Sequence, residues 1–117
     1  MFEDNNNREY ARLLSLLEIN VVLDDQTVVK GQTKNIGFGG VQLELPLYIA
    51  VDQEVKLIIV HHGKPFTIWS KCIWSKPKGQ LVSSCDAGFT FLSDDRETYE
   101  RLRDLLNELV DNESMVI

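Results

Sequence analysis

Two arginines near the start of the chain have the side chains and the spacing to hold an anion. Arg8 and Arg12 stand four residues apart in "REYAR", which places both side chains on one side of a helix or of an extended segment. Two guanidinium groups on one side can bind phosphate oxygens in pairs and can contact a guanine base. An isolated pair of this kind is more often solvated charge than a binding site. A second sequence element is therefore needed before the pair can be interpreted as a binding site.

A glycine-rich stretch supplies that second element. The segment "NIGFGG", residues 35–40, precedes the alternating stretch "VQLELP". Glycine weakens a strand, so Gly37, Gly39 and Gly40 mark a turn, a bulge or a close approach of another group to the backbone. The cluster matches neither a Walker phosphate loop nor a dinucleotide-binding fingerprint, because it precedes a strand and not a helix. A bend between two strands and a ligand lying against the backbone both remain open.

The other reactive side chains predict no enzyme and no metal site. No activated nucleophile or acid–base pair is visible. His61 and His62 are adjacent, and neighbours on a strand point to opposite faces, so we expect a hairpin end and not a shared ion. Cys72 and Cys85 fit neither a metal-ligand spacing nor a disulfide framework, and we expect two free thiols on strands.

Short strands separated by turn residues account for most of the chain. Val41, Leu43 and Leu45 alternate with polar neighbours, the period of a half-buried strand. Apolar alternation also occurs in "EVKLIIVHH", "PFTIWSKCIWSK" and "LVSSCDAGFTFL", and a further strand is expected at residues 18–23. No helical pattern lies between these stretches, which favours an antiparallel barrel or sandwich.

The C-terminal segment has a different period. Apolar residues recur there at three- and four-residue spacing and predict an amphipathic helix at about residues 94–110: Tyr99, Leu102, Leu105, Leu106, Leu109 and Val110. We expect Ser93 or Asp94 to cap this helix, with Glu97 as the reciprocal partner. The helix is expected to pack over an end or side of the barrel.

Length and charge limit the classes of partner. The 117 residues suffice for a single domain. A net charge of −6 argues against a nonspecific polyanion binder and so against DNA, although a small anion in one basic pocket is still allowed. No apolar run approaches the length of a membrane span, and the first ten residues lack a secretory signal. We therefore expect no membrane insertion and a cytoplasmic location.

In order and spacing, the two elements resemble the PilZ domain, a family of bacterial receptors for cyclic di-GMP. The family has an Arg-x-x-x-Arg segment and, about two dozen residues later, Asp/Asn-x-Ser-x-x-Gly at the start of a strand. Here Arg8 and Arg12 form the first half, and Asn35 through Gly40 form the second. The stretches "VQLELP", "IWSKCIWS" and "AGFTFL" extend the resemblance to about Leu109.

The resemblance implies a fold and a binding site. The fold is a six-stranded antiparallel β-barrel of the split-barrel type with a C-terminal α-helix, formed by residues 13–117 and preceded by a flexible segment at residues 1–12. The ligand is cyclic di-GMP, with no metal, and the implied nucleotide-binding residues are Arg8, Arg12, Asn35, Gly37, Gly39, Gly40 and Trp74.

Two of these positions need comment. Gly37 stands where the family has Ser, so one hydroxyl contact is missing, while we expect the backbone N–H of Gly37 to remain free for the ligand. Strand parity groups Trp74 with Phe66, Ile68 and Cys72, which favours a place in the core unless a bulge intervenes.

The implied function is a cyclic di-GMP sensor. Binding would order the N-terminal segment and alter docking to a protein partner that controls motility or exopolysaccharide production. The alternative is a PilZ-like adaptor that binds proteins and no nucleotide, through "YIAV" at residues 48–51 or through the helix.

Overall fold

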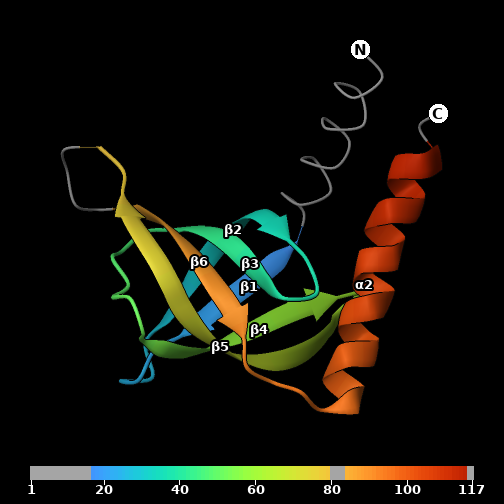
Figure 1. Ribbon diagram of the computed structural model, residues 1–117, viewed down its shortest axis with the longest axis horizontal. Helices are drawn as coiled ribbons and strands as arrows, with labels where there is room; N and C mark the ends of the chain where they lie inside the picture. Colours follow the sequence, from blue (N-terminus) through green and yellow to red (C-terminus); the bar gives the residue numbers. More distant parts are fainter. Residues whose placement is uncertain (1–16, 80–83, 116–117) are drawn as a thin grey trace.

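The computed structural model describes residues 17–79 and 84–115, and within them six antiparallel strands close into a barrel beside one long helix (Figure 1). The order around the barrel is β1-β2-β3-β6-β5-β4, and β4 pairs with β1 to close it. The expected barrel with a C-terminal helix is confirmed. The elements are β1 (Glu18–Val22), β2 (Val28–Ile36), β3 (Gly40–Leu45), β4 (Glu54–His61), β5 (Lys64–Pro77), β6 (Cys85–Phe91) and α2 (Arg96–Met115).

The barrel interior is filled by the alternate residues of each strand. In β4, Val55, Leu57 and Ile59 are buried while their neighbours are more exposed, as the period of two requires. Leu57 lies opposite Val21 across the β1–β4 junction that closes the barrel. Full burial of one such aliphatic side chain contributes about 1.5–3 kcal/mol. The closely packed core therefore keeps the strands in fixed positions, and with them the loops that connect the strands.

The hairpin between β4 and β5 overturns one expectation. His61 ends β4, and His62 and Gly63 form the two-residue turn with φ of 53° and 73°. Such left-handed turns match the twist of a β-hairpin. Because the alternation of side chains holds only for extended backbone, His62 is not directed away from His61. The two rings lie with centroids 4.3 Å apart, so the expectation of opposite faces is wrong.

The helix α2 begins two residues later than expected, with Asp95 as its cap. The Asp95 carboxylate accepts hydrogen bonds from the backbone N–H of Thr98 at 3.0 Å and from its hydroxyl at 2.7 Å. These bonds lower the pKa of Asp95. Ser93, expected as a cap, instead accepts the backbone N–H of Trp69 on β5 at 2.8 Å. The expectation of Ser93 or Asp94 as the cap is therefore wrong.

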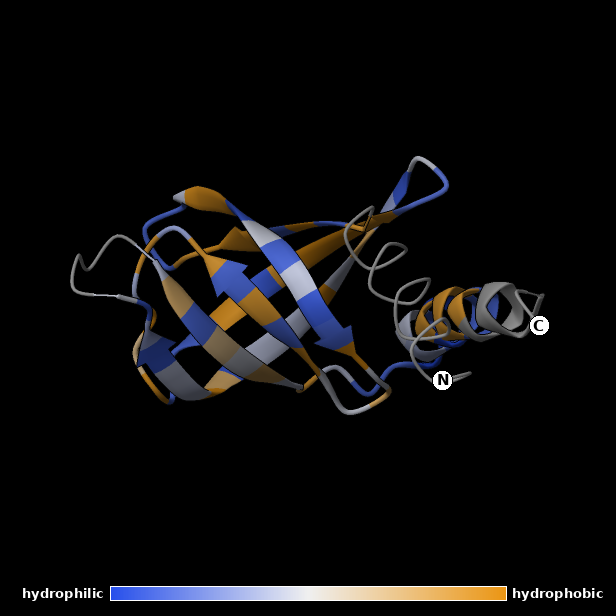
Figure 2. Ribbon diagram, turned by 90° about the horizontal axis from the view of Figure 1, so that it is seen from above, coloured by the Kyte–Doolittle hydropathy of each residue, from blue (hydrophilic) through white to orange (hydrophobic). Residues whose placement is uncertain are grey.

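The apolar side of α2 packs into the same hydrophobic cluster as the barrel interior. Figure 2 views the helix almost end-on, with its hydrophobic and hydrophilic residues on different sides. The buried helix residues are Leu102, Leu105, Leu106 and Leu109. This confirms the predicted amphipathic helix, which continues to Met115 and so beyond the predicted end. Among the described residues, no helix combines the length and hydrophobicity needed to cross a lipid bilayer.

The two cysteines are structural residues of neighbouring strands. Cys72 on β5 and Cys85 on β6 are both buried and unbonded to each other. The Cys72 thiol donates to the Trp74 carbonyl at 3.2 Å, and the Cys85 thiol donates to the Leu47 carbonyl at 3.1 Å. Burial raises the pKa of Cys72, which keeps it protonated and unreactive. The expectation of two free strand thiols is confirmed.

Candidate functional site

The glycine-rich turn connects β2 to β3 and is fastened to β6. The N–H of Gly37 donates to the carbonyl of Gly40 at 2.9 Å. The carbonyl of Gly39 accepts the N–H of Phe91 at 2.9 Å and the hydroxyl of Thr90 at 3.3 Å. The expectation that the Gly37 N–H stays free for a ligand is therefore wrong, because the turn itself uses it. The turn is consequently held in place by hydrogen bonds at both of its ends.

The three glycines of the turn differ in whether a neighbouring group excludes a side chain at their position. A Cβ on Gly40 would overlap the carbonyl oxygen of Phe89 on β6, so this glycine permits close packing of two strands. A Cβ on Gly37 or on Gly39 would meet nothing within 4 Å. The crowding of glycines is thus explained in part by the barrel's own packing, while two of the three leave open space above the turn.

Trp74 reaches the surface through a bulge in β5. The β5–β6 register shifts between Cys72 and Trp74, and Ile73 and Trp74 are both exposed, at 51% and 38%. The exception stated for strand parity therefore applies, because a bulge reverses the side on which later residues lie. Trp74 pairs with Gly88 across the strands, and a Cβ on Gly88 would overlap the indole ring. Because Gly88 has no side chain, the indole of Trp74 can lie directly against the backbone of β6.

These features surround one open cavity of about 340 Å³. Asn35 enters it from the end of β2, beside a second register shift between Thr33 and Asn35. Five of the seven residues implied as nucleotide-binding line this cavity, and the complete lining is Asn35, Ile36, Gly37, Gly39, Gly40, Val41, Gln42, Ile73, Trp74, Gly88, Phe89 and Thr90. Arg8 and Arg12 lie outside the described residues.

None of the residues in this described lining carries a charge. Lys34, the sequence neighbour of Asn35, lies 3.6 Å from the carboxylate of Glu44, which Lys78 also contacts at 3.2 Å. The hydrogen bond from Lys78 is the main reason that the pKa of Glu44 is lowered. These nearby charges, on β2, on β3 and just after β5, are thus paired with each other. A phosphate in the cavity would need its positive partners from elsewhere in the chain.

The groups that line the cavity are suited to holding a planar ring. Trp74 offers an aromatic face, and the Asn35 amide offers both an acceptor and donors. The described lining contains no nucleophile with a neighbouring base. Sequence reasoning missed Gly88, Gln42 and Thr90 as lining residues. Only Gly88 had a sequence signal, since a glycine inside a strand marks a close approach of another group.

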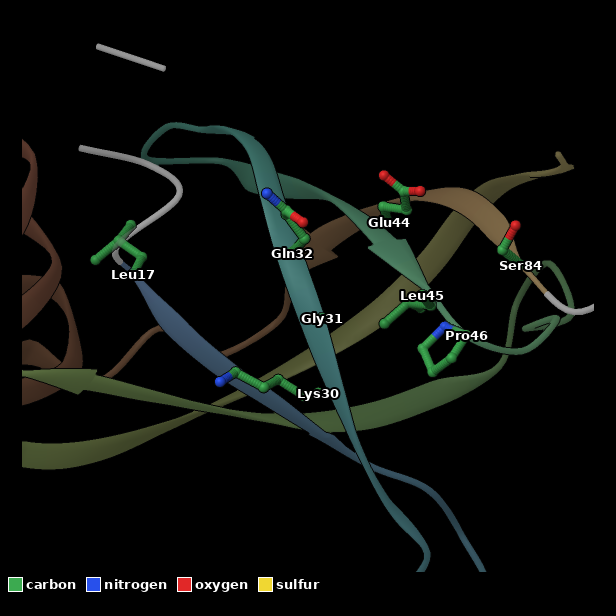
Figure 3. Close-up of a pocket in the computed structure, with 8 residues that line it drawn as sticks. All are labelled: Leu17, Lys30, Gly31, Gln32, Glu44, Leu45, Pro46 and Ser84. Carbon is green, nitrogen blue, oxygen red and sulfur yellow. The ribbon is translucent and has the colours of Figure 1, made fainter. Parts of the chain in front are cut away.

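A larger cavity of about 540 Å³ lies on another part of the barrel. Figure 3 shows Lys30 and Gln32 of β2 and Glu44 of β3 at its wall, with Leu17 toward one end and Ser84 toward the other. It contains none of the residues implied as nucleotide-binding. We therefore choose the smaller cavity as the candidate site because of the residues that line it, although the other cavity has the larger volume.

The comparisons with known proteins agree with this architecture. A family model described as the PilZ domain matches residues 6–108. The chain is similar in structure to the PilZ domain of YcgR from Escherichia coli, solved with c-di-GMP, with a TM-score of 0.66, 11% identity and coverage of 81% of this chain and 82% of that one. It is also similar to the PilZ domain of CeSA from a cellulose-synthesizing bacterium, with a TM-score of 0.57, 15% identity and coverage of 80% and 91%. Curated protein sequences contain no match.

Proposed function

The chain belongs to the PilZ domain family, and on that premise we propose that it is a receptor for cyclic di-GMP. The observation that carries the proposal is the cavity in which Asn35, the glycine turn and Trp74 meet from separate strands. A similar PilZ domain, that of YcgR, was solved with this ligand. The matched family is one of binding domains and not of enzymes.

The chemistry of the ligand matches the groups that surround the cavity. A guanine base stacks on the exposed face of Trp74, since aromatic stacking of a base contributes about 1–3 kcal/mol. The Asn35 carbonyl accepts from the N1 and N2 donors of guanine. The two phosphates need positive charge, which the described lining lacks. Arg8 and Arg12 supply it, because paired guanidinium groups bind phosphate oxygens bidentately.

Signalling follows from the place of those arginines in the chain. Residues 1–12 close over the cavity when Arg8 and Arg12 grip the ligand, and the closed segment changes the surface offered to a protein partner. That partner acts in motility or exopolysaccharide control, as the family resemblance implies. The proposed location of the receptor is the cytoplasm.

Calorimetric titration of the purified chain with cyclic di-GMP tests the proposal, with GTP and GMP as controls. We expect saturable binding that Arg12→Ala abolishes. Arg103→Ala, at a half-exposed arginine of α2, is the matched control and should bind as the wild type does. Absence of heat and of a thermal shift at high ligand concentration would refute the receptor function. Equal binding by the Arg12→Ala variant would refute the assigned role of that residue.

The second candidate function is a PilZ-like adaptor that binds proteins and no nucleotide. Exposed apolar side chains favour it: Tyr48 and Val51 are each about half exposed, and Phe38 stacks on Tyr99 of α2 with ring centroids 5.5 Å apart. Gly37, in place of the family's Ser, points the same way. The titration above separates the two functions, because an adaptor of this kind gives no nucleotide signal for Arg12→Ala to remove.

A further inference from the structure

Three side chains that the cyclic di-GMP site does not use converge at the β4–β5 hairpin. Nε2 of His61 lies 2.7 Å from Oε2 of Glu108, and Nε2 of His62 lies 2.8 Å from the same oxygen. The three potential ligand atoms all lie within 4.8 Å of one another. Two imidazoles and one carboxylate are a donor set that zinc accepts in proteins.

We propose that His61, His62 and Glu108 form a binding site for a Zn²⁺ ion that joins the β4–β5 hairpin to α2. The distances agree with this reading. Zinc binds imidazole nitrogen and carboxylate oxygen at about 2.0–2.2 Å in a tetrahedron, which separates neighbouring donor atoms by roughly 3.4 Å. The observed nitrogen–oxygen separations, 2.7 and 2.8 Å, are shorter than that by about 0.6–0.7 Å. Side-chain rotations that move the carboxylate away from the two rings by this amount would admit the ion.

The elements that carry the ligands hold them in place before any ion arrives. The left-handed backbone of His62, with φ of 53°, turns its ring to the same side as that of His61. Glu108 projects from α2 between the buried residues Leu105 and Leu109, so the helix is anchored on both sides of it. The position of Glu108 is thus set by core packing and not by a flexible loop. Ligands on rigid elements need little reorganisation to bind.

The exposed fraction of the side chain increases from His61 through Glu108 to His62, so the cluster is open to solvent on the side of His62. The side chain of His61 is 14% exposed, that of Glu108 is 41% exposed and that of His62 is 70% exposed. An ion can therefore approach past His62, and water can complete its coordination. Three protein ligands and one open position describe a four-coordinate zinc site.

The surrounding charges are compatible with a cation. A cavity of about 280 Å³ contains the three ligands together with Lys64, Arg101 and Asp104. The guanidinium of Arg101 is occupied elsewhere, donating to the Lys64 carbonyl at 3.0 Å and lying 4.8 Å from the centroid of the Phe66 ring. Asp104, on the same side of α2, is paired with Arg103 at 3.6 Å.

The donor set also predicts which ions bind. Imidazole nitrogen is a good ligand for zinc and other late transition metals, whereas Mg²⁺ and Ca²⁺ prefer all-oxygen sites. His61 and His62 are the only histidines of the whole sequence, and both cysteines are buried. Competition from other strong zinc ligands of the chain is therefore small.

Titration of the metal-stripped full chain with ZnCl₂ at neutral pH tests the site. We expect one ion per chain by calorimetry, a rise in the melting temperature, and no response to MgCl₂ or CaCl₂. His62→Ala should weaken zinc binding at least about tenfold. It should leave the ion-free melting temperature nearly unchanged, because His62 is mostly exposed. Glu108→Gln should weaken binding similarly, while the matched control Glu100→Gln, on the same helix, should bind as the wild type does.

The ring nitrogens give a readout that does not depend on how the variants fold. Addition of ZnCl₂ to the wild-type chain should shift the Nε2 resonances of both histidines in an ¹⁵N NMR spectrum. Unshifted Nε2 signals at saturating zinc would overturn the proposal. So would undiminished binding by both His62→Ala and Glu108→Gln, or failure of the wild-type chain to bind. None of these outcomes bears on cyclic di-GMP binding, which uses other residues.

Discussion

At the scale of single residues, the glycines around the candidate site divide into two kinds. Gly40 and Gly88 make room for other groups of the protein, namely the Phe89 carbonyl and the Trp74 indole. Gly37 and Gly39 face open space and have no positive φ. Substitutions at the two kinds of position should therefore have different effects, and each kind serves as a control for the other.

Gly40→Ala should destabilise the barrel. The new Cβ would overlap a backbone carbonyl of β6, which cannot move without shifting the strand, and overpacking of this kind costs about 1–3 kcal/mol. Urea unfolding followed by circular dichroism measures the loss. Gly39→Ala should unfold close to the wild type, because its Cβ meets no neighbour. Equal midpoints for the wild type and the Gly40→Ala variant would contradict the close approach of β3 to β6.

Gly88→Ala should displace the indole of Trp74 from its position against the backbone of β6. The added methyl group occupies space that the Trp74 ring now fills. We expect a changed fluorescence emission from Trp74 and weaker cyclic di-GMP binding, since the aromatic face would move out of the cavity. Trp69→Phe in both backgrounds removes the emission of the second tryptophan. Unchanged emission and unchanged affinity together would show that the ring does not depend on Gly88.

Gly37→Ser should strengthen cyclic di-GMP binding. It restores the hydroxyl that the family pattern has at this position, and a Cβ added there meets no other atom within 4 Å. One additional neutral hydrogen bond contributes about 1 kcal/mol, or roughly fivefold in affinity. Parallel calorimetric titrations of wild type and variant measure the gain, with Gly39→Ser as the control. Equal affinities would mean that the ligand makes no contact at residue 37.

At the scale of elements, the start of α2 depends on one carboxylate. Asp95→Ala should lower the melting temperature by a few degrees, because the N–H and hydroxyl of Thr98 lose their acceptor. The pKa of Asp95 is lowered from its ordinary value of 3.8 by these hydrogen bonds. Its stabilising effect is therefore complete above that value and is lost as the pH falls through the lowered pKa.

Thermal melts over a pH series measure this dependence. The difference in melting temperature between wild type and the Asp95→Ala variant should be constant from about pH 5 upward and should shrink below about pH 4. Asp94→Ala is the matched control and should melt like the wild type at every pH. A wild-type advantage that grows toward acid pH would contradict the cap.

The elements could be predicted from the sequence wherever the backbone is regular. The alternation of Val41, Leu43 and Leu45 and the helical spacing of the leucines in α2 follow directly from burial on one face, and both are confirmed. The failures occur where the backbone departs from that regularity. The bulge before Trp74 and the left-handed turn at His62 reverse the parity of the side chains. The bulge has no distinctive residue pattern. The hairpin end at His61 and His62 was expected, but the left-handed backbone of His62 was not.

The candidate site was predictable in part for the same reason. Asn35 and the glycine turn could be found because their residue types are unusual beside a strand. Gln42 and Thr90 could not be found, because each is an ordinary polar strand residue that reaches the cavity only through the pairing of β3 with β6. Long-range pairing, which local patterns do not encode, therefore decides the rest of the lining.

At the scale of the whole molecule, closure of the barrel limits where a ligand can cause change. All six described strands have two hydrogen-bonded neighbours, and the shared core extends into α2. Close-packed cores of this kind do not deform continuously. Ligand binding at the cavity should therefore act on segments outside the barrel, and the proposal assigns this role to residues 1–12, which precede β1 in the sequence.

Amide hydrogen exchange with and without cyclic di-GMP tests this division of the molecule. Saturating ligand should slow exchange in residues 5–14, because Arg8 and Arg12 become fixed when they bind the phosphates. Exchange in the core strands should stay nearly unchanged, since their amides are already protected by the closed hydrogen-bond network. At the ligand concentration that saturates the wild type, the Arg12→Ala variant should show no slowing of amide exchange in residues 5–14. Protection spread over the barrel, with none in residues 5–14, would instead mean that the barrel transmits the signal and that the N-terminal segment does not.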